Sequence, residues 1–168
     1  MAEFTNSNIV TVAEGQNLPL TETAEKCGSC ITHREGAGIV TLRGLTNQCR
    51  ARYKVSFGAN ISIPAGGTVT PISIALAIAG EPLNSATAFV TPAAVGEYFN
   101  VFTAAFIDVP RGCCITIAVE NTSTQAINIA NSNLIVERVM ASHIVLTSTG
   151  IAIITVIHVR ITPAAVSS

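Results

Sequence analysis

The sequence predicts an all-β fold, either a β-sandwich or a jelly roll, and three observations carry that prediction. Short runs rich in Val, Ile and Thr recur along the chain with Gly, Pro and Asn between them, which is typical of strands joined by turns. Helical periodicity is almost absent, so a parallel α/β fold is excluded. Residues 49–57 alternate between apolar and polar side chains, as a half-buried strand does.

The segment 49–57 is the strongest strand prediction. Its inward face would carry Cys49, Ala51, Tyr53, Val55 and Phe57. We expect Tyr53 and Phe57 to lie in the core. The opposite face carries Arg50, Arg52 and Lys54, which could meet an anion such as a phosphate-bearing glycan or an acidic protein patch. A solvated strand face explains these three cations equally well.

The remaining predicted strands share β-branched composition and flanking turn residues. They are residues 9–12, 38–42, 60–63, 68–78, 88–91, 100–109, 114–120, 126–129 and 134–139. Turns are expected at 64–67, 79–82 and 110–112, where Pro and Gly supply the required backbone angles. Many strands at short spacing, with no helix-length segment between them, favour a sandwich or jelly roll.

Composition limits the functions that are open to this chain. Its 168 residues are enough for one domain. Hydrophobic residues make up 49% and charged residues 11%, with a net charge of −1, so no basic field is available for nucleic acid. With Asp108 the single aspartate and no Gly-x-Ser-x-Gly segment, a Ser-His-Asp site is disfavoured. We therefore predict a protein that is not an enzyme and has no cofactor.

The two ends of the chain differ from the middle. Residues 1–8 are predicted to form a short polar arm that lacks a secretory signal and docks through Phe4 on a partner chain. Residues 140–168 form a hydrophobic extension, predicted as a β-hairpin with strands at 144–147 and 151–161. A membrane span is disfavoured because His158 and Arg160 lie inside the apolar run. This hairpin offers candidate assembly contacts at Ile151, Ile153 and Ile157.

Five cysteines leave several interpretations open. Cys27 and Cys30 have the spacing of a redox pair or half a zinc site, but the second half is missing. Cys113 and Cys114 are adjacent, so their side chains point to opposite faces of a strand. We expect Cys49 and one of these two to be buried, and Cys27 and Cys30 to form disulfides within or between subunits in an oxidising compartment. The odd count leaves one thiol over or implies an intermolecular bridge.

Several stretches together resemble a known superfamily, the trimeric jelly rolls of the tumour-necrosis-factor and complement globular-head type. The matching stretches are 9–20, 31–42, 53–60, 74–83, 106–121 and 134–139. Bacterial versions of these domains cap collagen-like filaments on spore surfaces. The sequence of this chain resembles gut-phage virion structural proteins more than it resembles the spore proteins. The resemblance covers residues 9–139 and implies an antiparallel, TNF-like jelly roll that forms homotrimers. It also makes Phe99, Phe102 and Phe106 candidates for lining a threefold axis.

Three departures from the family pattern are the extension at 140–168, the absence of a collagen stalk and the five cysteines. The expected function is that of a structural protein acting by assembly, as a head-decoration or fibre module on a bacteriophage virion surface. Its partners would be further copies of itself and a capsid or other virion protein. Two alternatives stay open: a filament subunit of a bacterial cell or spore surface, which would be extracellular, and a glycan- or receptor-binding head.

Overall fold

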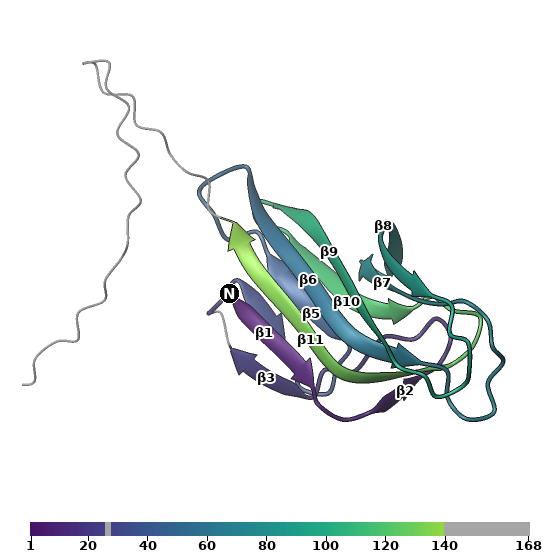
Figure 1. Ribbon diagram of the computed structural model, residues 1–168. Coiled ribbons are helices and arrows are strands. Elements are labelled where there is room, and N and C mark those ends of the chain that lie inside the picture. The colour runs from purple at the N-terminus through teal and green to yellow at the C-terminus, as the bar shows by residue number, and fades with distance from the viewer. Residues whose placement is uncertain (26–27, 140–168) are drawn as a thin grey trace, which may run out of the picture.

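The computed structural model describes residues 1–25 and 28–139 and is all-β. Its strands form two antiparallel sheets that pack face to face as a jelly roll (Figure 1). The strands are β1 (Ala2–Asn6), β2 (Val10–Val12), β3 (Glu22–Glu25), β4 (Ile31–His33), β5 (Ile39–Arg43), β6 (Arg50–Ser62), β7 (Ile72–Ile78), β8 (Glu81–Val90), β9 (Phe99–Pro110), β10 (Cys114–Asn121) and β11 (Ile127–Val139). The predicted fold class is thereby confirmed. The described residues include no helix with the length and apolar character to span a membrane.

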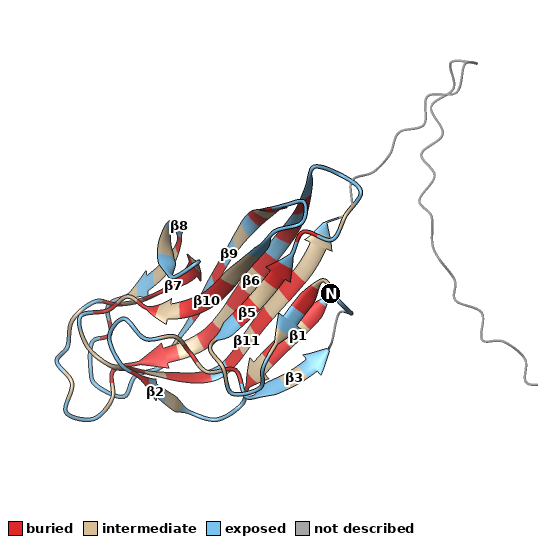
Figure 2. Cartoon of the chain, turned by 180° about the vertical axis from the view of Figure 1, so that it is seen from behind, coloured by how far each residue is buried: buried red, intermediate tan, exposed pale blue. Residues whose placement is uncertain are grey.

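The strand order defines the edges of the two sheets. The first sheet has the order β3-β1-β11-β6-β9, with β2 also paired to β11. The second has the order β4-β5-β10-β7-β8. Strands β9 and β8 therefore form one lateral edge of the sandwich, and contacts between them join the sheets there. Figure 2 shows buried positions alternating with more exposed ones along β6 and β11.

Strand β6 follows the predicted alternation and supplies the centre of the core. Tyr53, Val55 and Phe57 are fully buried, which confirms Tyr53 and Phe57 as core residues. The Tyr53 hydroxyl donates a 2.6 Å hydrogen bond to the Arg43 carbonyl oxygen, so its polar end is satisfied. The strand continues through the segment 60–62 that the sequence predicted as a separate strand.

Strand β11 likewise joins two predicted strands into one of 13 residues. The register against β6 shifts between Ala130 and Asn133, and Asn131 has a φ of 50°. Asn tolerates this left-handed conformation better than most residues. A β-bulge therefore allows one strand to continue where the apolar pattern changes phase.

The N-terminal segment corrects the expectation of an arm that docks on a partner. Residues 2–6 form β1, which lies between β3 and β11 in the first sheet. Phe4 is only 2% exposed, and its ring lies 4.8 Å from the ring of His33. The buried positions alternate as Ala2, Phe4 and Asn6, and only one of these is a large apolar residue. The strand pattern is too weak to recognise without its partner β11.

Three further details differ from the sequence prediction. The short strands β3 and β4 were not predicted, because each has few apolar residues. Strand β7 begins at Ile72 rather than at residue 68, since Pro71 has no N–H for the ladder. Strand β8 begins at Glu81 and is longer than the predicted 88–91, directly after a turn in which Ala79 and Gly80 have positive φ.

Candidate assembly surface

The outer face of strand β9 carries two exposed aromatic rings. Val101, Thr103 and Ile107 point into the core and are buried, so the alternate positions point outward. Phe102 and Phe106 occupy two of these outward positions, and each is 66% exposed. Because β9 is the edge strand of the first sheet, both rings lie beside an unpaired strand edge.

Small residues lie beside Phe102, whereas Lys54 lies opposite Phe106 on β6. Ala104 lies between them on β9, and across the pair Phe102 is opposite Gly58 and Ala104 is opposite Ser56 on β6. A methyl group built on Gly58 would lie 3.9 Å from Cδ2 of Phe102, so the ring covers this glycine. We call Phe102, Ala104, Phe106, Ser56 and Gly58 the aromatic patch. Its two exposed rings are the kind of apolar feature that marks association sites.

Phe99 does not belong to the aromatic patch. It starts β9 and pairs with Ile61, a fully buried residue. By strand parity Phe99 is on the inward face, and it is half-buried. The structure thus separates Phe99 from Phe102 and Phe106 within one chain.

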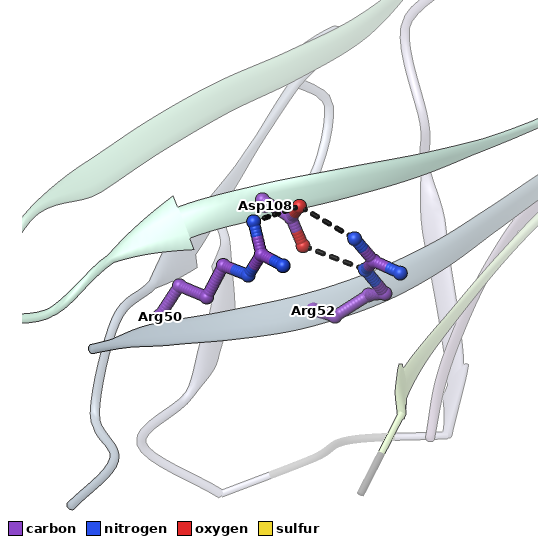
Figure 3. A network of polar contacts seen from close by, with 3 residues as sticks. All are labelled: Arg50, Arg52 and Asp108. Atoms are coloured by element: carbon purple, nitrogen blue, oxygen red, sulfur yellow. Dashed lines mark hydrogen bonds and ion pairs between the residues drawn. The ribbon is translucent and has the colours of Figure 1, made fainter. Parts of the chain in front are cut away.

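The same outer face is charged toward the end of β9. Arg52 donates two hydrogen bonds to the Asp108 carboxylate, at 2.7 and 2.8 Å (Figure 3). Arg50 lies 3.3 Å from the same carboxylate. The hydrogen bond from Arg52 is the main reason that the pKa of Asp108 falls below its usual 3.8, and it also raises the pKa of Arg52. Asp108 lies inside β9, in agreement with the predicted strand 100–109.

The three cations that were predicted to face an anion are therefore paired with carboxylates of the same chain. Arg50 and Arg52 share Asp108, and Lys54 Nζ lies 4.0 Å from Glu137. Pairing in this register places opposite charges on neighbouring strands, as cross-strand pairs commonly do. The three cations and Glu137 are well exposed and Asp108 is partly exposed, so the pairs contribute little to stability. The signal available in the sequence was the single aspartate, but its partner depends on the β6–β9 register.

The cysteines are placed differently from expectation. Cys49, Cys113 and Cys114 are all exposed, which corrects the prediction that Cys49 and one of the other two are buried. Cys49 precedes the first residue of β6, so it lies beyond the part of the pattern that the core covers. Cys30 is half-buried and its Sγ receives a 3.7 Å hydrogen bond from Arg138. Cys27 lies outside the described residues, as do Ile151, Ile153 and Ile157.

The His33 side chain is held by contacts within the fold. Its Nε2 lies 2.9 Å from the Ala37 carbonyl oxygen, and since a carbonyl only accepts, this nitrogen carries the proton. Its ring packs on Phe4. Within residues 1–25 and 28–139, no three His, Cys, Asp or Glu side chains are grouped closely enough to hold a metal ion.

Comparison with known proteins shows which solved structures share this fold. No family model and no curated protein match the sequence. Among solved structures, the Eiger TNF protein from S. frugiperda superimposes with a TM-score of 0.61 and 16% identity, covering 84% of this chain and 93% of that one. The globular domain of a zebrafish complement 1qA protein superimposes with a TM-score of 0.56 and 10% identity, covering 80% and 94%. The chain thus has the C1q/TNF-like jelly-roll fold.

Proposed function

We propose that this protein is a structural component that acts by self-assembly, forming homotrimers through the aromatic patch. The observation that carries the proposal is the pair Phe102 and Phe106, each 66% exposed on an edge strand whose inward-facing positions are covered by the core. Fully burying a phenylalanine contributes about 1.5–3 kcal/mol. Each copy would contribute two rings, and the small residues beside Phe102 would let a second backbone approach closely there.

The trimeric state follows from the resemblance of residues 9–139 to the trimeric jelly rolls and is supported by the C1q/TNF-like fold. The composition agrees with assembly, because only 11% of the residues are charged and a monomer would leave the patch in water. In this arrangement β9 of each copy would face the threefold axis. The paired charges at Asp108 and Glu137 would lie at its rim.

Sedimentation velocity of the full chain at micromolar concentration tests this proposal in reducing buffer. We expect the wild type to sediment as a trimer and the variant Phe102→Asp/Phe106→Asp to sediment as a folded monomer. Phe89→Asp is the matched control, since Phe89 is 77% exposed on β8 of the second sheet. A wild-type protein that sediments as a 17.4 kDa monomer, or a control that dissociates equally, overturns the proposal.

The setting that we propose is the surface of a bacteriophage virion, as a head-decoration or fibre module. The support is the resemblance of the chain to phage virion structural proteins. Genes for a capsid and a tail beside this one would support the setting. Their absence, together with genes for a spore coat or cell surface, would favour the filament subunit instead.

We also propose that residues 140–168 join trimers to each other or to a capsid. Val139, the last described residue, pairs with Arg52 at the charged end of the first sheet, so the extension begins beside the proposed interface. An apolar segment of this length could add a strand to a neighbouring sheet edge. In that role Ile151, Ile153 and Ile157 would be contact residues.

A further inference from the structure

Three connections that carry cysteines meet at one end of the jelly roll. The Arg43 amide donates a 2.9 Å hydrogen bond to the Cys30 carbonyl, which joins the β3–β4 connection to β5. The next amide, that of Gly44, donates at 2.8 Å to the Cys113 carbonyl in the β9–β10 connection. Residues far apart in the sequence are thereby held side by side.

The β5–β6 connection joins the same group. The Arg111 amide donates a 3.0 Å hydrogen bond to the Cys49 carbonyl, and Cys114 pairs with Arg43 in the ladder between β10 and β5. A side chain on Gly44 would collide with the Pro110 carbonyl oxygen, so close packing fixes the two connections relative to each other. We call Cys49, Cys113 and Cys114 the thiol end.

The thiol end is a continuation of the proposed interface. Cys49 immediately precedes β6 and Cys113 follows the turn after β9. These are the two strands that carry the aromatic patch. Copies that meet through β9 would therefore bring their thiol ends near one another, and all three thiols are exposed and free in the structure.

We propose that the thiol end forms disulfides between copies of this chain and so locks the assembly covalently. This inference rests on the proposed self-association, because the two thiols must come from copies that are already in contact. Disulfides within one chain account for these cysteines less well than disulfides between copies. Cys113 and Cys114 are adjacent in the chain, where a bond between them is strained, and five cysteines cannot all pair within one chain.

The oxidant can be a low-molecular-weight disulfide such as oxidised glutathione. The thiolate of one copy attacks it, forming a mixed disulfide and releasing one glutathione thiolate. The thiolate of a second copy then attacks the protein sulfur of that mixed disulfide and releases the other glutathione thiolate. Two protein thiols lose two electrons and two protons, and one oxidised glutathione becomes two reduced molecules.

The experiment incubates the full chain with oxidised glutathione, blocks remaining thiols by alkylation, and separates the products by electrophoresis without reductant. We expect covalent dimers and trimers for the wild type, and a loss of at least about tenfold in these species for the triple variant Cys49→Ser/Cys113→Ser/Cys114→Ser. Cys30→Ser is the control and should retain the wild-type ladder, because Cys30 is half-buried and engaged by Arg138.

Three outcomes overturn the inference. The first is a ladder that survives in the triple variant. The second is a wild type that loses free thiols while staying at monomer mass, which means pairing within the chain, and the third is a trimer that never cross-links. Sedimentation of the same samples in reductant keeps the two proposals apart. A trimer that never cross-links contradicts the disulfides alone, whereas a monomer contradicts the assembly itself.

Discussion

The outer face of β6 and β9 has two halves, which differ in whether their side chains have partners within the same chain. At the charged half, Arg50 and Arg52 share Asp108, so the polar groups have partners in the same molecule. At the aromatic patch, Phe102 and Phe106 each remain 66% exposed. The first half is complete in a monomer and the second is not. In the proposed trimer the apolar half would drive association, while the charged half would limit its extent and set its register.

The largest expected effect comes from placing a charge inside the aromatic patch. Ala104→Glu puts a carboxylate between the two rings, where association would take the charge out of water. We expect the dissociation constant of the trimer to rise at least about 100-fold, as measured by sedimentation equilibrium, with no change in the fold by circular dichroism. Ser85→Glu, at an exposed position of β8, is the control. Equal weakening by both variants would show that general charge, not this patch, controls association.

Truncation after Val139 separates the patch from the extension. If the aromatic patch alone holds the trimer, the shortened chain sediments as a trimer and only particles larger than a trimer disappear from light scattering. A truncated chain that becomes a monomer would mean that residues 140–168 hold the trimer together. In that case the charged half would be part of the interface itself, because the extension starts beside it at Val139.

A smaller effect is expected at Gly58, beneath the ring of Phe102. Gly58→Ala places a methyl group at an ordinary 3.9 Å from Cδ2 of that ring, so trimer affinity should hardly change. Gly58→Val adds two more carbons and displaces the ring, which should weaken the trimer about tenfold, or about 1.4 kcal/mol. Isothermal dilution calorimetry of both variants measures this difference. Similar affinities for the two would argue that Phe102 has no fixed position in the interface.

The smallest effect is expected in the charged half. The folded chain holds the pKa of Asp108 below 3.8, so its contribution to stability is fully present above 3.8 and is lost as pH falls through the lowered value. Asp108→Asn should therefore be slightly less stable than wild type above that range and equal to it below. Urea unfolding of the monomeric Phe102→Asp/Phe106→Asp background at pH values on both sides measures the gap. A gap that widens in acid would contradict a lowered pKa for Asp108.

Much of the fold could be predicted because the alternation of apolar and polar residues within one strand shows which of its faces is buried. The alternation in 49–57 identifies β6 and places Tyr53 and Phe57 inside, without knowledge of any neighbour. The role of Phe102 and Phe106 at a threefold axis came instead from the family resemblance and stays a prediction. Strand β1 escaped prediction because it has one large apolar residue, Phe4, and becomes a strand through pairing with β11.

The thiol end and the Arg–Asp cluster depend on information that no single segment contains. Arg52 meets Asp108 only through the β6–β9 register, and Cys49 approaches the β9–β10 turn only through the Arg111 amide. The predicted strand 100–109 included Asp108 without identifying its partner, and Cys49 was expected in the core from the alternation of its immediate neighbours alone. Contacts between segments that are distant along the chain therefore had to be seen in three dimensions.

The pairing of β1 with β11 also sets the order in which this molecule can be built. Ala2 lies opposite Val136 in the ladder, so β1 cannot complete this pairing until β11 has been synthesised. Long sequence separation between partners slows folding, and unpaired strand edges on a nascent chain invite aggregation. We expect the second sheet, whose β7–β8 hairpin is local, to be organised before the first.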